Sequence, residues 1–77
     1  MATYNGHKNW NHWNVSLWIN NDQGLYQLAR ACLKGYAGKR EQCARGMFLE
    51  LRDRGITQTP DGAPYSVSSI RAAMVGM

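Results

Sequence analysis

The chain of 77 residues lacks the features that mark several large classes of protein. No apolar run approaches the ~20 residues that a membrane-spanning helix needs. The first residues hold no basic stretch followed by an apolar one, which a secretory signal requires. Charged residues make up only 18% of the chain and hydrophobic residues 44%, which indicates a folded chain. We therefore expect one small domain over residues 1–77, not bound to a membrane and working in the cytoplasm of the cell that makes it.

Residues that support catalysis or bind a metal are also few and scattered. The two cysteines, Cys32 and Cys43, are too few for a disulfide scaffold, and their apolar helical positions predict buried, reduced thiols. A zinc site with His7 and His12 would need closely spaced cysteines, whereas ten residues separate these two. The five carboxylates stand apart, and no glycine-rich phosphate-binding loop is present. The sequence thus predicts no catalytic residues, no metal and no cofactor, and a protein that is not an enzyme.

Hydrophobic periodicity predicts a mainly α fold, a compact bundle of about four helices. Apolar residues spaced three or four apart indicate helices over about residues 9–20, 22–34 and 39–54, and a last one after Ser66. The sequence Thr-Pro-Asp-Gly at 59–62 predicts a tight turn or small hairpin before the last helix. Gly46 falls inside the third predicted helix, where a close approach between helices would explain it.

All three tryptophans lie in the first predicted helix and share one broad face of it. We expect Trp13 and Trp18 to lie in the core, because no other element offers side chains as large. Trp10 is expected nearer the edge, where it is a candidate contact residue. The exposed histidines His7 and His12 are further candidates beside it.

The chain is basic, with nine Lys and Arg against five Asp and Glu and a formal charge of +4. This balance favours acidic partners, nucleic acid included. Eight of the nine basic residues follow Asp22, so the tryptophan segment carries almost no charge. Arg45 and Arg52, seven residues apart on the third predicted helix, suit phosphate contacts, and an exposed salt-bridge face with Glu41 is the other interpretation.

The stretch LELRDRGITQTPDGAPYSVSSIRAAM, residues 49–74, resembles the end of the recombinase domain of large serine recombinases. The resemblance implies a helix-turn-helix-like element with Ser66, Ser68, Ser69 and Arg71 at the exposed start of the last helix. Hydroxyls and an arginine there suit contacts with phosphates or base edges. In the other interpretation, the serines cap and solvate the helix and Arg71 is an ordinary surface charge.

The stretch YNGHKNWNHWNVSLWINNDQGLYQLA, residues 4–29, together with GITQTPDG at 55–62, resembles a family of short uncharacterised proteins of phages and other mobile elements. Their shared signature runs Trp-Asn-Val-x-Leu-Trp-Ile and then Asn-Asp-x-Gly-Leu-Tyr. This chain departs from the pattern at His7, where tryptophan is usual, and at His12, where threonine is usual. Either departure could retune an exposed contact.

The two resemblances imply two different functions, both without catalysis: the phage resemblance implies an inhibitor, and the recombinase resemblance implies DNA binding. The one we favour from the sequence is a protein that binds and inhibits a host factor by occupying its surface, as inhibitors of CRISPR effectors do. Its partner would be a host protein complex, with a CRISPR effector as one example, in the cytoplasm of the host cell. The alternative is a small DNA-binding accessory protein that uses the basic third helix and the start of the last helix.

Overall fold

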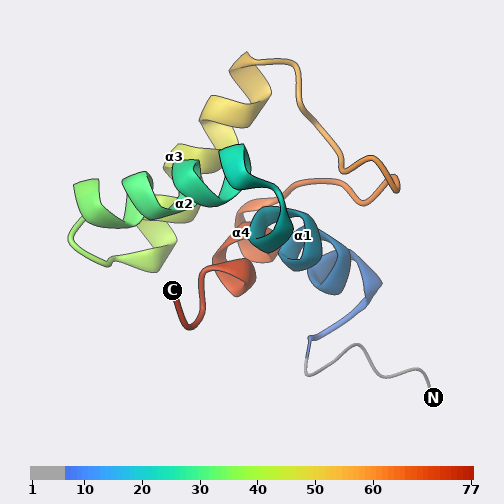
Figure 1. The fold of residues 1–77 in the computed structure, drawn as a ribbon, viewed down its shortest axis with the longest axis horizontal. Helices are drawn as coiled ribbons and strands as arrows, with labels where there is room; N and C mark the ends of the chain where they lie inside the picture. Colours follow the sequence, from blue (N-terminus) through green and yellow to red (C-terminus); the bar gives the residue numbers. More distant parts are fainter. Residues whose placement is uncertain (1–6) are drawn as a thin grey trace.

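The computed structural model describes residues 7–77, which form four helices: α1 (Trp10–Asn21), α2 (Gln23–Gly35), α3 (Arg40–Asp53) and α4 (Val67–Ala73). In this part of the chain there is no strand, and one isolated antiparallel bridge pairs Gln58 with Pro64. α4 packs against α1 and α3, and α2 packs against the same two helices (Figure 1). The predicted mainly helical bundle, with a tight turn before the last helix, is confirmed.

Side-chain caps set where three of the helices begin. The Asn9 side chain accepts a hydrogen bond from the backbone N–H of His12 at 3.0 Å and caps α1. Asp22 ends α1 and accepts from the N–H of Leu25 at 2.9 Å, so a single residue separates α1 from α2. At α4, Ser66 and Ser69 form a reciprocal capping box. The connection between α1 and α2 is therefore one residue, whereas residues 54–66 connect α3 to α4.

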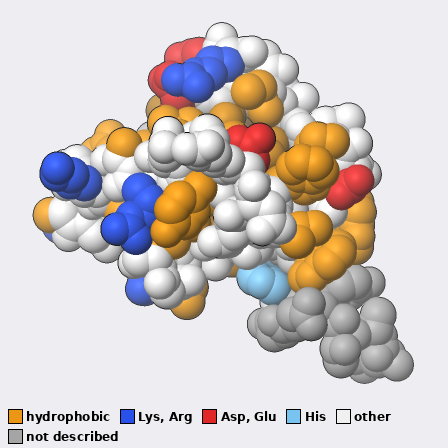
Figure 2. Space-filling view, in the orientation of Figure 1, with side chains coloured by type: hydrophobic (Ala, Val, Ile, Leu, Met, Phe, Trp, Pro, Cys, Tyr) orange, Lys and Arg blue, Asp and Glu red, His pale blue; other side chains and the backbone are white. Residues whose placement is uncertain are grey.

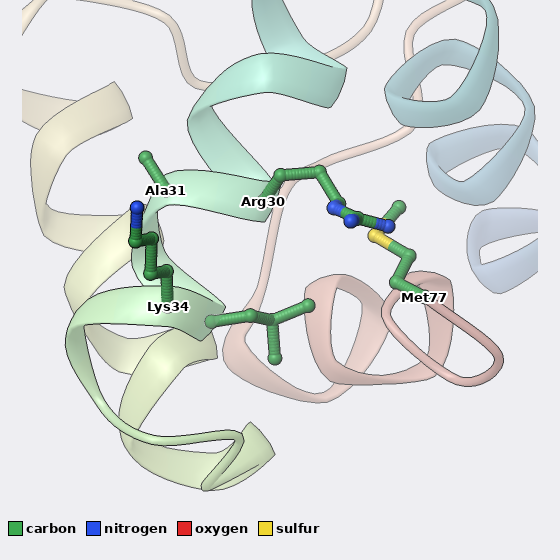
Figure 3. Close-up of a pocket in the computed structure, with 5 residues that line it drawn as sticks. Arg30, Ala31, Lys34 and Met77 are labelled. Atoms are coloured by element: carbon green, nitrogen blue, oxygen red, sulfur yellow. The ribbon is translucent and has the colours of Figure 1, made fainter.

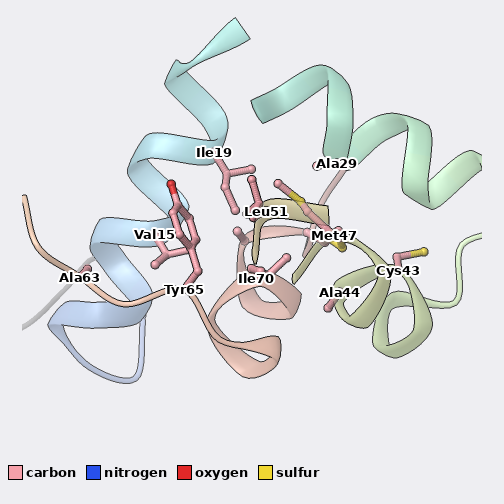
Figure 4. Packing of buried hydrophobic residues seen from close by; sticks show 12 residues of the cluster. Val15, Ile19, Ala29, Cys43, Ala44, Met47, Leu51, Ala63, Tyr65 and Ile70 are labelled. Carbon is pink, nitrogen blue, oxygen red and sulfur yellow. The ribbon is translucent and has the colours of Figure 1, made fainter. Parts of the chain in front are cut away.

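The core lies where the four helices meet. Within the described residues it consists mostly of small and branched side chains, which lets the short helices approach closely (Figure 4). The largest fully buried hydrophobic side chains are Ile19, Met47, Leu51, Ile70 and Met74. Burial of each such side chain contributes about 1.5–3 kcal/mol. Twelve hydrophobic residues make up this cluster: Val15, Ile19, Ala29, Cys43, Ala44, Met47, Leu51, Ala63, Tyr65, Ile70, Ala73 and Met74.

The tryptophans do not fill the centre of this core. From α1 the buried residues are Asn14, Val15 and Ile19, whereas Trp13 and Trp18 are only partly buried. The prediction that both are core residues is therefore wrong. An indole carries an N–H that needs a partner, and Trp18 finds one at the surface. Trp10 is 37% exposed, which confirms the prediction that it lies near the edge. Figure 2 shows hydrophobic side chains on the face over α1 and over the loop that follows α3.

The Thr-Pro-Asp-Gly turn docks on α1 through polar side chains. The side-chain amide of Asn14 and the indole N–H of Trp18 donate to the same carboxylate oxygen of Asp61, at 2.8 and 2.9 Å. The hydroxyl of Thr59 donates to the side-chain oxygen of Asn14 and accepts from the backbone N–H of Ala63. Asn14 and Thr59 are each only 1% exposed. We call Asn14, Trp18, Thr59 and Asp61 the turn clamp, and it fixes the loop that leads into α4.

Two smaller predictions have mixed outcomes. Both cysteines are free thiols, as predicted, but only Cys43 is buried and Cys32 is half-buried. The space at Gly46 is taken by the ring of Tyr36, because a Cβ there would lie 3.2 Å from a ring carbon. The close neighbour of Gly46 is therefore a tyrosine ring from the α2–α3 connection, and not the backbone of another helix.

Candidate functional site

Three arginines from two helices line one groove on the surface of the bundle. Arg40 and Arg45 come from α3 and Arg71 comes from α4, and the groove has a volume of about 650 Å³. We call it the arginine groove. Its other lining residues are His12, Glu41, Val67, Ser68, Ala72 and Val75.

Helix geometry shows how the α3 residues of the groove are placed. At about 100° per residue, Arg40, Glu41 and Arg45 fall within an arc of about 140°. Met47 and Leu51, which α3 buries in the core, fall within about 20° of Arg40 on the same count. Arg40 is therefore exposed because it stands in the first turn of the helix, whereas Glu41 and Arg45 lie to one side of the buried face. α4 lies against α3 through its own buried Ile70, so Arg71, one residue further along, lies beside the charged arc.

Glu41 pairs with two of the arginines. One of its oxygens lies 3.1 Å from Nε of Arg45 and the other lies 3.8 Å from Nε of Arg71. The side chains of Arg45, Arg71 and Glu41 are 69%, 58% and 51% exposed, and ion pairs this exposed contribute only about 0–1 kcal/mol. Arg40 makes no ion pair within residues 7–77. Three arginines against one glutamate leave the groove with two positive charges to offer a ligand.

His12 and Ser68 add neutral hydrogen-bonding groups at the edge of the groove. Nε2 of His12 lies 3.3 Å from the hydroxyl of Ser68. Partial burial, followed by the positive charges of Lys8 and His7, lowers the pKa of His12 from its ordinary value of 6.5. The imidazole is therefore neutral near neutral pH, and it gains charge only in acid.

The structure brings together four of the eight residues that the sequence singled out, namely His12, Arg45, Ser68 and Arg71. Ser69 is fully buried, and its hydroxyl accepts a hydrogen bond from the backbone N–H of Ser66 in the capping box. The expectation of an exposed Ser69 at the start of the last helix is therefore wrong. The reason is that the third residue of a capped helix faces back toward the cap.

Arg52, His7 and Trp10 lie outside the arginine groove. Arg52 is exposed in the last turn of α3, about 18 Å along the helix axis from Arg40. His7 lines a separate shallow hollow of about 220 Å³ with Trp13 and Leu17. Trp10 and Leu17 are each 37% exposed on α1. The sequence-predicted contact residues thus divide between the arginine groove and α1, except that Arg52 lies on neither surface and Ser69 is buried.

Sequence reasoning missed Arg40 as a groove residue. It stands at the first position of α3 and reads as a simple helix start. Its spacing from Arg45 gave no signal, because five residues correspond to about 140° around a helix.

A second hollow, also missed, lies along α2. It has a volume of about 490 Å³ and is lined by Arg30, Ala31, Leu33, Lys34 and Met77 (Figure 3). The signal was the i, i+4 spacing of Arg30 and Lys34, which places two cations on one face of the helix. We call this feature the α2 hollow.

Neither the arginine groove nor the α2 hollow contains a pair of side chains that could act as general acid and general base. Glu41 is the sole acidic side chain that lines either one, and it is paired with two arginines. No group of three or more His, Cys, Asp or Glu within residues 7–77 could hold a metal ion. No helix in the described part of the chain has the length and apolar character to cross a bilayer. The arrangement can bind an anion through guanidinium, hydroxyl and imidazole groups.

Comparison with known proteins gives a family without an assigned activity. No curated protein and no solved structure matches the chain. The family model of DUF7249, described as a family of unknown function, matches residues 1–77, and the chain belongs to this family.

Proposed function

We propose that the protein is a small non-enzymatic accessory protein that binds nucleic acid through the arginine groove. The observation that carries the proposal is the convergence of Arg40, Arg45 and Arg71 from two helices on one groove. The resemblance to phage and mobile-element proteins supports a role in the cytoplasm of the host cell.

Phosphate is the ligand that this set of side chains suits best. A guanidinium presents a planar fork of N–H donors that matches two phosphate oxygens, and its charge is permanent. The exposed pairs of Arg45 and Arg71 with Glu41 are weak enough to exchange for a phosphate. The hydroxyl of Ser68 adds a neutral donor at the same edge. Contacts of this kind position a backbone and do not read its sequence.

The test is an anisotropy titration of a labelled oligonucleotide at several salt concentrations. We expect Arg45→Ala and Arg71→Ala each to weaken binding by about tenfold, because each removes a charge-assisted contact. Each should also reduce the slope of log affinity against log salt by about 0.9 on duplex. Arg52→Ala is the matched control: it removes the same charge from the same helix outside the groove, and its affinity should stay near that of the wild type. Binding that does not change with salt, or equal losses in all three variants, would refute the proposal.

A second candidate, inhibition of a host factor, has its own supporting observation. Leu17 is exposed in the hollow that it lines with His7 and Trp13, and Trp10 is exposed on the same helix, so α1 presents large apolar side chains to solvent. Exposed aromatic residues of this kind commonly anchor protein interfaces. The partner would be a host protein complex such as a CRISPR effector.

The two candidates separate in a pull-down from host lysate, with and without nuclease. Inhibition predicts one host protein that survives nuclease treatment and is lost with Trp10→Ala and Leu17→Ala. Nucleic-acid binding predicts material that nuclease removes and that depends on Arg45 and Arg71.

A further inference from the structure

The α2 hollow combines positive charge with an apolar floor. Arg30 and Lys34 stand at its edge, and Leu33 and Met77 supply carbon and sulfur surface within it. No Asp or Glu side chain lines this hollow, and no ion pair of either cation is found within residues 7–77. A ligand that fits must therefore carry both an anion and a flat or apolar body.

Arg30 is held in place for such a ligand. Its guanidinium carbon lies 5.9 Å from the centroid of the Tyr26 ring, one helical turn earlier on α2. This cation–π contact restricts the side chain without neutralising its charge. Figure 3 shows the Arg30 side chain extending toward Met77 while Lys34 lies at the other edge. The two cations thus stand on either side of the apolar floor.

The α2 hollow and the arginine groove flank the same short segment. Val75 lines the arginine groove and Met77 lines the α2 hollow. Only Gly76 separates them, so their Cα atoms lie at most about 7.6 Å apart. A strand of nucleic acid that follows this segment from Val75 to Met77 therefore contacts both the groove and the hollow.

We infer that the ligand is single-stranded nucleic acid and that the α2 hollow takes one of its unpaired nucleotides. This inference rests on the proposed function of the arginine groove. The base covers Leu33 and Met77, and its phosphate lies between Arg30 and Lys34. A paired base in a duplex has both faces stacked on its neighbours, so only an unpaired base can lie flat on this floor.

The test compares a labelled single strand of about 16 nucleotides with the duplex of the same length. We expect the wild type to bind the single strand more tightly. The double variant Arg30→Ala/Lys34→Ala should lose about tenfold in affinity for the single strand, with a salt slope lower by about 1.4. The charge-matched control is Arg52→Ala/Arg54→Ala, which removes two exposed arginines at the far end of α3. On duplex the two double variants should behave alike.

A strand of the same length that lacks bases separates the base contact from the phosphate contact. Wild-type affinity should fall by about fivefold or more on this strand, because base stacking contributes to binding. If Arg30→Ala/Lys34→Ala matches its control on the single strand while Arg45→Ala and Arg71→Ala still weaken binding, the inference is wrong and the proposed function stands. If the wild type binds neither single strand nor duplex, the proposed function fails and the inference fails with it.

Discussion

Replacing Asn14 with alanine should lower the free energy of unfolding by about 1–3 kcal/mol, through the turn clamp. Asn14 is 1% exposed, and its side-chain oxygen accepts the hydroxyl of Thr59, which is 1% exposed as well. The substitution leaves that buried hydroxyl without its acceptor, and this desolvated donor accounts for the loss. It also removes the amide that donates to Asp61 at 2.8 Å.

The matched control is Asn11→Ala, an exposed asparagine in the same helix. Both substitutions gain the same helix propensity, so the difference between them isolates the clamp. A domain of 77 residues has a stability of about 4–12 kcal/mol, so the expected loss is a large fraction of the total. Urea unfolding followed by circular dichroism measures it, and the melting temperature should fall by about 4 °C or more. A difference from Asn11→Ala within about 0.5 kcal/mol would refute the reasoning.

Hydrogen bonds from Asn14 and then Trp18 lower the pKa of Asp61 below its ordinary value of 3.8. The carboxylate therefore adds stability above that value and loses it as the pH falls through the folded pKa, so urea midpoints below about pH 4 should drop less steeply in Asp61→Asn than in the wild type. Ser69→Ala should cost about 0.5–2 kcal/mol of stability through the capping box. Ser68→Ala should leave the urea midpoint unchanged and weaken oligonucleotide binding. A lowered midpoint with unchanged binding in Ser68→Ala, and the opposite result in Ser69→Ala, would contradict the assignment of Ser69 to the cap and of Ser68 to the groove. Gly46→Ala should gain up to about 1 kcal/mol of helix propensity, because the exposed Tyr36 ring can shift away from the new Cβ. A melting temperature below that of the wild type would show that the ring cannot move.

The helices were predictable from sequence because their apolar periodicity and caps agree. α2 shows this best, since Leu25, Leu28, Ala29, Cys32 and Leu33 lie on one stripe and all lie in or against the core. The Thr-Pro-Asp-Gly turn was predictable for a similar reason, because Gly62 adopts a φ of 95° that only glycine adopts easily. Local chemistry decided these elements.

The inward face of α1 was not predictable in the same way. Apolar residues occur all around this helix. The hydrophobic periodicity therefore does not show whether the tryptophans or the pair Val15 and Ile19 face the core. Size favoured the indoles, but the space between short helices admits branched aliphatic side chains more closely. Trp18 also has a partner for its N–H at Asp61, 43 residues further along the chain. No local pattern reports a contact over that separation.

The arginine groove needed the packing of two helices before it could be recognised. Arg45 and Arg71 could be singled out as basic residues, but nothing in the sequence places α4 against α3. The spacing of residues along a helix shows which of them share a face, but not which other helix lies beside that face. For this reason Arg40 was missed as a groove residue and Arg52 was included as a contact residue. Ser69 could have been found as a buried cap, since a serine three residues after an N-cap serine can complete a capping box.

The residues that carry the phage resemblance and those that form the arginine groove are largely different. Asn14 and Trp18 of the first stretch meet Thr59 and Asp61 of the second in the turn clamp, and Val15 and Ile19 are core residues. Folding therefore accounts for these residues of the signature that the sequence suggests, whereas Leu17 of the same signature is 37% exposed. The three groove arginines, Arg40, Arg45 and Arg71, lie outside both stretches, whereas His12, a departure from the signature, lines the groove. We therefore expect that a chain with the same clamp but different groove residues folds alike and does not bind the same ligand.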